Sequence, residues 1–132
     1  MRHFLYICIF AVIFSSNSLA LSSREISQLK SLDPQTRIEQ ACNIAAMEKI
    51  KQSLNVSPEK MIAYAFGDTF LSNHNFKAPH AAIRINHKWY YLSYDCTAKS
   101  DHIHIEQIKV ELGTLVPRNL WDPHYLVPAA GV

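Results

Sequence analysis

The chain has 132 residues, with 13 Lys and Arg against 11 Asp and Glu. This near-neutral balance gives no electrostatic footprint for nucleic acid or for an anionic membrane, so we expect no nucleic-acid partner. The length suits one small globular domain with a core of its own.

The N-terminus predicts a cleavable signal peptide, residues 1–20. Arg2 is followed by an apolar run over residues 4–14, which is too short for a hydrocarbon core of roughly 30 Å. We therefore expect no stable membrane span. The small residues Ser18 and Ala20 suit signal peptidase, so we predict cleavage after Ala20 and a periplasmic location, with an uncleaved anchor as the alternative. Residues 21–132 would then form a single mature domain.

Cleavage would remove Cys8 and leave Cys42 and Cys96. An even number of cysteines in an exported chain argues for one disulfide, which would close a long loop. Two buried free thiols are the alternative. Because a bridged cysteine is no nucleophile, we do not expect a Cys-His catalytic pair.

Two helices are expected first. Ser22 and Glu25 form the pattern of a capping box, which predicts a short helix that ends near Ser31. Asp33 can accept hydrogen bonds from the free amides of a second helix, which we place at Pro34–Leu54. One face of that helix is apolar at helical spacing: Ile38, Ala41, Cys42 and Ala45.

The apolar period changes to two beyond Ser57-Pro58, which indicates strands. Lys60–Phe66 is a predicted strand, and the polar segment Gly67–Pro79 is interpreted as a loop. The hairpin His80–Cys96 follows, with a tight turn at Asn86-His87. The turn sets one register: Ile85 opposite Lys88, Ile83 opposite Tyr90 and Ala81 opposite Leu92. This register puts the apolar residues of both arms on one face of the hairpin. Cys96 lies on the same face.

The last predicted strand is Ile103–Leu112, with a β-bulge near Glu106-Gln107 that keeps its apolar residues on the core side. The tail from about residue 114 is too apolar to remain in water, and we expect it to dock. The fold class is therefore α+β in two layers, with the helices packed on one face of an antiparallel meander of three or four strands.

Several stretches carry a family resemblance: Arg37-Ile-Glu-Gln-Ala-Cys42, Ala46-Met-Glu-Lys-Ile50, Ala81-Ala-Ile-Arg84, Lys88-Trp-Tyr90, Asp95-Cys-Thr97, Asp101-His102, Gly113, Pro117-Arg118, Trp121 and His124-Tyr-Leu126. Over residues 29–127 the chain resembles the domain of unknown function 930 family of exported alphaproteobacterial proteins. The resemblance implies a bacterial source and a periplasmic location. It implies no activity, so function has to be argued from the site.

A histidine pair is the candidate metal site. His102 and His104 have strand spacing, which would put two imidazoles on one face, and His80 or Asp101 could complete a ligand set. The alternative is the solvated face of a strand, because a metal site needs three or four convergent ligands. We assign no metal and no cofactor, and a metal-dependent enzyme that uses His102 and His104 remains an alternative function.

The second face of the sheet carries the candidate partner-binding residues Arg84, Trp89, Tyr91 and Lys109. Rings supply contact area at low entropy cost, so a face with aromatic side chains and cations suits a glycan, a peptide or a protein.

The tail offers another interpretation of that face. Trp121, Tyr125 and Leu126 could fold back over Trp89 and Tyr91 and make a second small core, which would avoid an uncovered aromatic patch. The surface around Arg84 would then remain the candidate binding surface.

No catalytic residues are assigned. The carboxylates Asp95, Asp101, Glu106 and Glu111 have no fixed catalytic separation, and no nucleophile motif is present. The leading hypothesis is a non-enzymatic binding or accessory module of the cell envelope, with an envelope protein or glycan as partner. A purely structural envelope protein is a further alternative.

Overall fold

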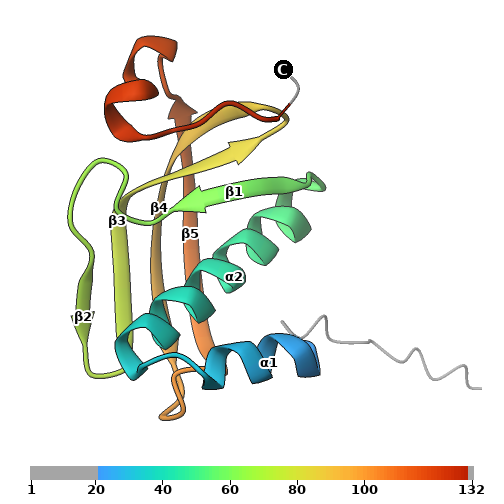
Figure 1. Ribbon diagram of the computed structural model, residues 1–132, viewed down its shortest axis with the longest axis vertical. Coiled ribbons are helices and arrows are strands. Elements are labelled where there is room, and N and C mark those ends of the chain that lie inside the picture. Colours follow the sequence, from blue (N-terminus) through green and yellow to red (C-terminus); the bar gives the residue numbers. More distant parts are fainter. Residues whose placement is uncertain (1–20, 131–132) are drawn as a thin grey trace, which may run out of the picture.

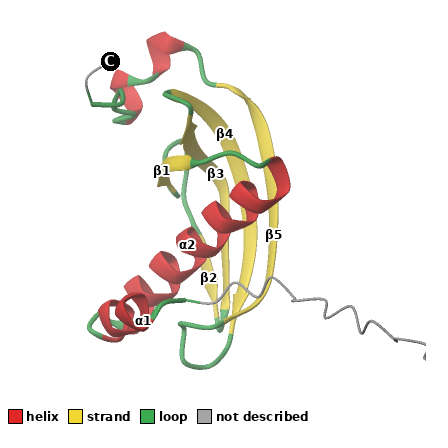
Figure 2. Ribbon diagram, turned by 90° about the vertical axis from the view of Figure 1, so that its right-hand side faces the viewer, coloured by secondary structure: helices red, strands yellow, loops and turns green. Residues whose placement is uncertain are grey.

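The computed structural model describes residues 21–130, in which two α-helices accompany a five-stranded antiparallel sheet (Figure 1). Figure 2 shows the longer helix lying along one side of that sheet. The predicted α+β class is confirmed, whereas the predicted signal peptide lies outside the described residues. No helix in the described part of the chain is both long and apolar enough to cross a membrane.

Both helices begin where their capping residues predict. Helix α1, Ser23–Lys30, carries the complete capping box between Ser22 and Glu25. Helix α2, Pro34–Leu54, starts after Asp33, whose side chain accepts a hydrogen bond from the backbone N–H of Thr36. The helix ends at Asn55, which has a left-handed backbone conformation.

The strands run in the order β1-β3-β4-β5. Strand β2 pairs with the first residues of β3, on the same edge that pairs with β1 further along. Their bounds are β1 Pro58–Ile62, β2 Phe70–Ser72, β3 Asn75–Ile85, β4 Lys88–Ala98 and β5 Ile105–Leu115. The three long strands β3, β4 and β5 form the expected meander, in which each is antiparallel to the next.

The central hairpin has the predicted register. Ile85 pairs with Lys88, and Ile83 pairs with Tyr90. Asn86 and His87 both have positive φ, 50° and 66°, as a two-residue turn that matches the twist of its strands requires.

Two predictions ahead of this hairpin are wrong. The strand expected at Lys60–Phe66 is Pro58–Ile62, because the chain turns at Ala63 and the N–H of Phe66 bonds to the carbonyl of His80 instead. The segment Gly67–Pro79 is not a loop throughout. It contains β2 and the first residues of β3, so the sheet has more strands than the three or four expected.

Bulges bend the long strands. The register shifts between Ala78 and Ala81 in β3, and Figure 1 shows β3 and β4 turning at this level. In β5 the shift opposite Thr97 and Ala98 falls at Glu106, as predicted. A second shift lies near Gly113.

The main core lies between α2 and the sheet. Buried residues of the helix, among them Ile38 and Ala46, meet Ile83 and Leu92 of the hairpin. The predicted disulfide crosses this core: Cys42 and Cys96 are both fully buried, and their Cα atoms are 5.9 Å apart.

The tail builds a second core on the opposite face. It contains two short 3₁₀ helices, η1 Arg118–Leu120 and η2 Asp122–His124. Trp121 and Leu126 pack with Trp89, which is 0 % exposed. The expectation that Tyr125 would join this cover is wrong, since its side chain points to solvent and is 84 % exposed.

Candidate functional site

An open groove crosses the second face of the sheet, opposite α2. Two adjoining hollows of about 640 and 270 Å³ share Pro79, Ser93 and Glu111. We call this the second-face groove and define it by eight side chains: Phe66, Phe70, Lys77, Tyr91, Ser93, Asp95, Lys109 and Glu111.

Charges alternate across the floor of the groove. Strand register places Lys77 of β3 beside Asp95 of β4, and Asp95 beside Lys109 of β5. The Lys77 Nζ atom lies 3.9 Å from Asp95 Oδ2, and both side chains are about half exposed. An exposed pair of this kind contributes little to stability, so these charges are available to a ligand.

Aromatic residues close the end of the groove nearest the tail. The rings of Phe66 and Tyr91 are 4.9 Å apart, and Phe66 also lies 4.2 Å from the ring of His124. The imidazole of His124 is anchored in turn, since its Nδ1 is 2.9 Å from the carbonyl oxygen of Ala65. A Cβ atom on Gly113 would lie only 2.9 Å from the Cβ of Tyr91, so glycine allows β5 to approach Tyr91 closely at this end of the groove.

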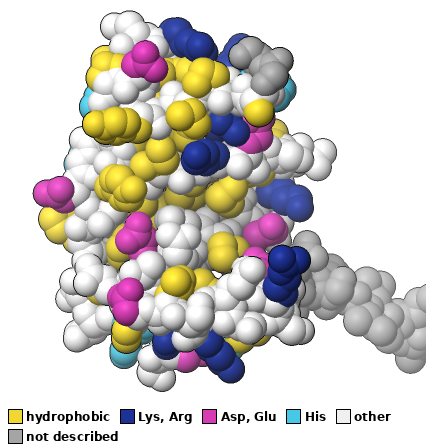
Figure 3. Space-filling model, viewed as in Figure 1, with side chains coloured by type: hydrophobic (Ala, Val, Ile, Leu, Met, Phe, Trp, Pro, Cys, Tyr) yellow, Lys and Arg dark blue, Asp and Glu magenta, His cyan; other side chains and the backbone are white. Residues whose placement is uncertain are grey.

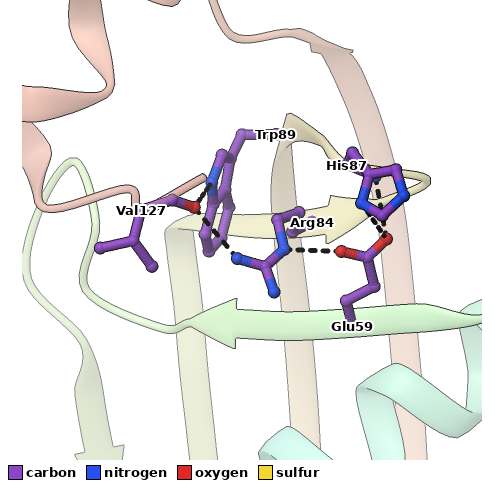
Figure 4. Close-up of polar contacts among 5 residues, drawn as sticks. All are labelled: Glu59, Arg84, His87, Trp89 and Val127. Carbon is purple, nitrogen blue, oxygen red and sulfur yellow. Dashed lines mark hydrogen bonds and ion pairs between the residues drawn. The ribbon is translucent and has the colours of Figure 1, made fainter. Parts of the chain in front are cut away.

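Arg84 belongs to a separate polar cluster beneath the tail (Figure 4). Its Nε donates to Glu59 Oε2 at 2.7 Å, and its Nη1 donates to the carbonyl oxygen of Val127 at 3.0 Å. The same carbonyl accepts the indole N–H of Trp89 at 2.9 Å. The backbone N–H of His87 also bonds to Glu59, and this bond, helped by Arg84, lowers the pKa of the Glu59 carboxyl.

The four candidate partner-binding residues therefore do not form one surface. Trp89 is core, and the prediction that it lies on a binding face is wrong, because the tail covers it. Arg84 is largely buried and satisfied by Glu59 and the tail. Tyr91 and Lys109 do line the second-face groove.

The histidines do not share a strand face. The strand begins at Ile105, and His102 lies before it in a left-handed turn conformation, so the strand spacing assumed for His102 and His104 is wrong. The ring of His102 contacts the carbonyl of Pro34 at 2.9 Å and the ring of His74 at 3.0 Å. Within residues 21–130, no three His, Cys, Asp or Glu side chains are grouped to hold a metal ion.

Asp101 organises the turn that leads into β5. Burial raises the pKa of its carboxyl, but bonds from the ring of His104 and from the backbone N–H groups of Ile103 and His104 outweigh that effect and lower the pKa to about 2. The carboxylate is thus committed to its own turn. His80, the other proposed ligand, packs over Gly67.

A second exposed surface lies on the face that carries the helices. Figure 3 shows apolar side chains gathered on the upper half of this face. A separate hollow of about 290 Å³ lies between the end of β1 and the tail, and it is lined by Ile62, Tyr64, Pro123 and Tyr125. It carries no charged side chain that would select a partner.

Comparison with family models decides the classification. The model of the domain of unknown function 930 (DUF930) matches residues 29–126. The chain belongs to this family. Neither the curated proteins nor the solved structures contain a match to it. The DUF930 match begins in α1 and ends at Leu126 in the tail, so it includes both cysteines, the second-face groove and Trp121.

The sequence does not reveal the whole groove of this DUF930 domain, because the polar composition of Gly67–Pro79 predicts a loop. That interpretation hid Phe70 on β2 and Lys77 on β3. A usable signal was present: Phe76 and Ala78 are apolar and alternate with polar Asn75 and Lys77, which is the period of a half-buried strand.

Proposed function

We propose that this DUF930 domain is an exported, non-enzymatic binding module of the cell envelope. Its ligand is an extended peptide segment of an envelope protein, held in the second-face groove. One observation carries the proposal. Lys77, Asp95 and Lys109 are neighbours across three strands, and their alternating charges face solvent in the groove.

Charge pattern favours a peptide over a neutral glycan. Exposed charges of alternating sign select a ligand that carries the opposite pattern, and rim charges mainly set specificity and the association rate. Glycan binding would draw on open ring faces. The largest ring of the predicted face, Trp89, is buried, and Tyr91 is half-buried against Phe66. Among the rings of the groove only that of Phe70 is exposed.

Two observations support an envelope location. The first twenty residues have the pattern of a signal peptide. Cys42 and Cys96 lie at disulfide geometry in the core, and structural disulfides persist mainly in oxidising compartments such as the periplasm.

Site-specific photo-cross-linking in the producing cell tests the proposal. A photoreactive amino acid replaces Ser93 at the centre of the groove or, in the control, Lys51 on the exposed side of α2. We expect an adduct of discrete mass from the Ser93 position alone, and peptide mapping should assign it to one segment of one envelope protein. A cross-link to a glycan would contradict the peptide ligand and show that the groove binds a glycan instead. Absence of any adduct, or the same adducts from both positions, would contradict binding in the groove.

A further inference from the structure

Strand β5 is the outer strand of the sheet, and its apolar residues are incompletely covered. In the described part of the chain β5 pairs with β4 alone, and Figure 2 shows it as the outermost strand on the side facing the reader. Ile108, Val110 and Leu112 are half-buried. Their register partners on β4 are at most 4 % exposed: Cys96, Tyr94 and Leu92.

The backbone groups that face outward from β5 can be assigned. The N–H of Lys99 bonds to His104 and the carbonyl of Trp89 accepts from Val116, both at 2.8 Å, so the odd residues of β4 face β5. Bonded and non-bonded pairs alternate along an antiparallel ladder. Gln107, Lys109 and Glu111 pair with odd residues of β4 and therefore use their backbone groups on that strand. The N–H and C=O groups of the intervening Ile108, Val110 and Leu112 point away from the sheet.

We infer that a second copy of this chain pairs with β5 edge to edge, antiparallel, about a two-fold axis at Val110. Val110 then faces its own counterpart, and Ile108 faces Leu112 of the second copy. Each of these residues has outward backbone groups, so the three pairs form about six interchain hydrogen bonds. The half-buried apolar side chains of β5 gain the cover that a neighbouring strand supplies. This inference is argued from the edge of β5 and not from the peptide ligand. It does engage two residues of the second-face groove, Lys109 and Glu111, so in the dimer the open charges of the groove are those of Lys77 and Asp95.

Charge complementarity selects this register. A two-fold axis at Val110 puts Lys109 opposite Glu111 of the second copy, and Glu111 opposite its Lys109. An axis at Lys109 or at Glu111 would put like charges opposite each other, which destabilises a strand pair. Charged residues on an edge strand normally discourage pairing with arbitrary strands, and here their order admits one symmetric partner.

The bulges of β5 limit the interface to the same residues. One lies at Glu106 and the other near Gly113, so the regular segment between them is residues 107–112. Bulges turn a strand edge away from further pairing. The free edge therefore matches the stretch over which the two-fold register is complementary.

Sedimentation velocity over a concentration series tests the inference, with protein produced from the full-length chain. The wild type should shift from the monomer mass towards twice that mass as concentration rises. Glu111→Lys puts a lysine opposite Lys109 of the second copy in both symmetry-related pairs, and it should raise the dimer Kd about tenfold. The double variant Lys109→Glu/Glu111→Lys restores opposite charges and should return the Kd to within about threefold of wild type.

Asp68→Lys, the same charge change in the exposed loop before β2, is the matched control and should leave the Kd unchanged. Thermal melts monitored by circular dichroism report whether each variant is folded. A wild type that stays monomeric at all concentrations would overturn the inference. So would a dimer that tolerates Glu111→Lys, or one that the double variant fails to restore while remaining folded.

Discussion

Replacing Cys42 and Cys96 together by alanine is expected to lower the free energy of unfolding by about 4 kcal/mol. The two residues are 54 positions apart, so the bridge closes a long loop and restricts the unfolded chain. Both side chains are also fully buried between α2 and β4. Because a domain of this size has roughly 5–15 kcal/mol of stability in total, the loss should be evident in a urea titration.

Reduction of the wild type is the control for this prediction. Wild type in excess reductant should have nearly the same unfolding midpoint as the double alanine variant, whereas the oxidised wild type should be far more stable. A variant within about 1 kcal/mol of the oxidised wild type would contradict a disulfide that fastens the helix to the sheet.

Trp89→Ala should cost about 3–5 kcal/mol, the typical loss for a large aromatic residue removed from a packed core. Trp89 is 0 % exposed, packs under Trp121 and Leu126, and donates its indole N–H to Val127. The variant loses this contact area and leaves the Val127 carbonyl with only the bond from Arg84. Urea unfolding, followed by circular dichroism, measures the effect.

Tyr125→Ala is the matched control, because it removes an aromatic ring from the same tail but from an exposed position. It should change the free energy of unfolding by no more than about 0.5 kcal/mol. If Trp89→Ala lowered the free energy of unfolding as little as Tyr125→Ala, this would contradict the burial of Trp89 in a second core beneath the tail. Trp89 would then again be a candidate surface residue.

Local patterns predicted the helices and the central hairpin. The capping residues at Ser22 and Asp33 act within one turn of chain, and the register at Asn86-His87 follows from alternation and a two-residue turn. The bulge at Glu106 followed from a change of parity along one strand. Such features depend on neighbours in sequence, so the sequence reveals them.

Long-range packing decided what the sequence did not predict. Gly67–Pro79 is polar in composition, but its second half is a strand because β4 pairs with it. Whether Trp89 faces a partner or the tail depends on where residues after 115 return, and no local pattern fixes that path. The two histidines have strand spacing, but the chain turns at His102 and starts its strand only at Ile105.

Binding of the cross-linked partner segment, as a synthetic peptide, tests the central claim most directly. Isothermal titration calorimetry would compare the wild type with Lys77→Glu in the groove and Lys51→Glu on α2. We predict a Kd at least about tenfold weaker for Lys77→Glu and an unchanged Kd for Lys51→Glu. Both lysines are exposed, but Lys77→Glu puts a second carboxylate opposite Asp95, so its melting temperature should fall slightly while that of Lys51→Glu stays unchanged. Equal affinity of the wild type and a folded Lys77→Glu variant would contradict recognition by the alternating charges of the second-face groove.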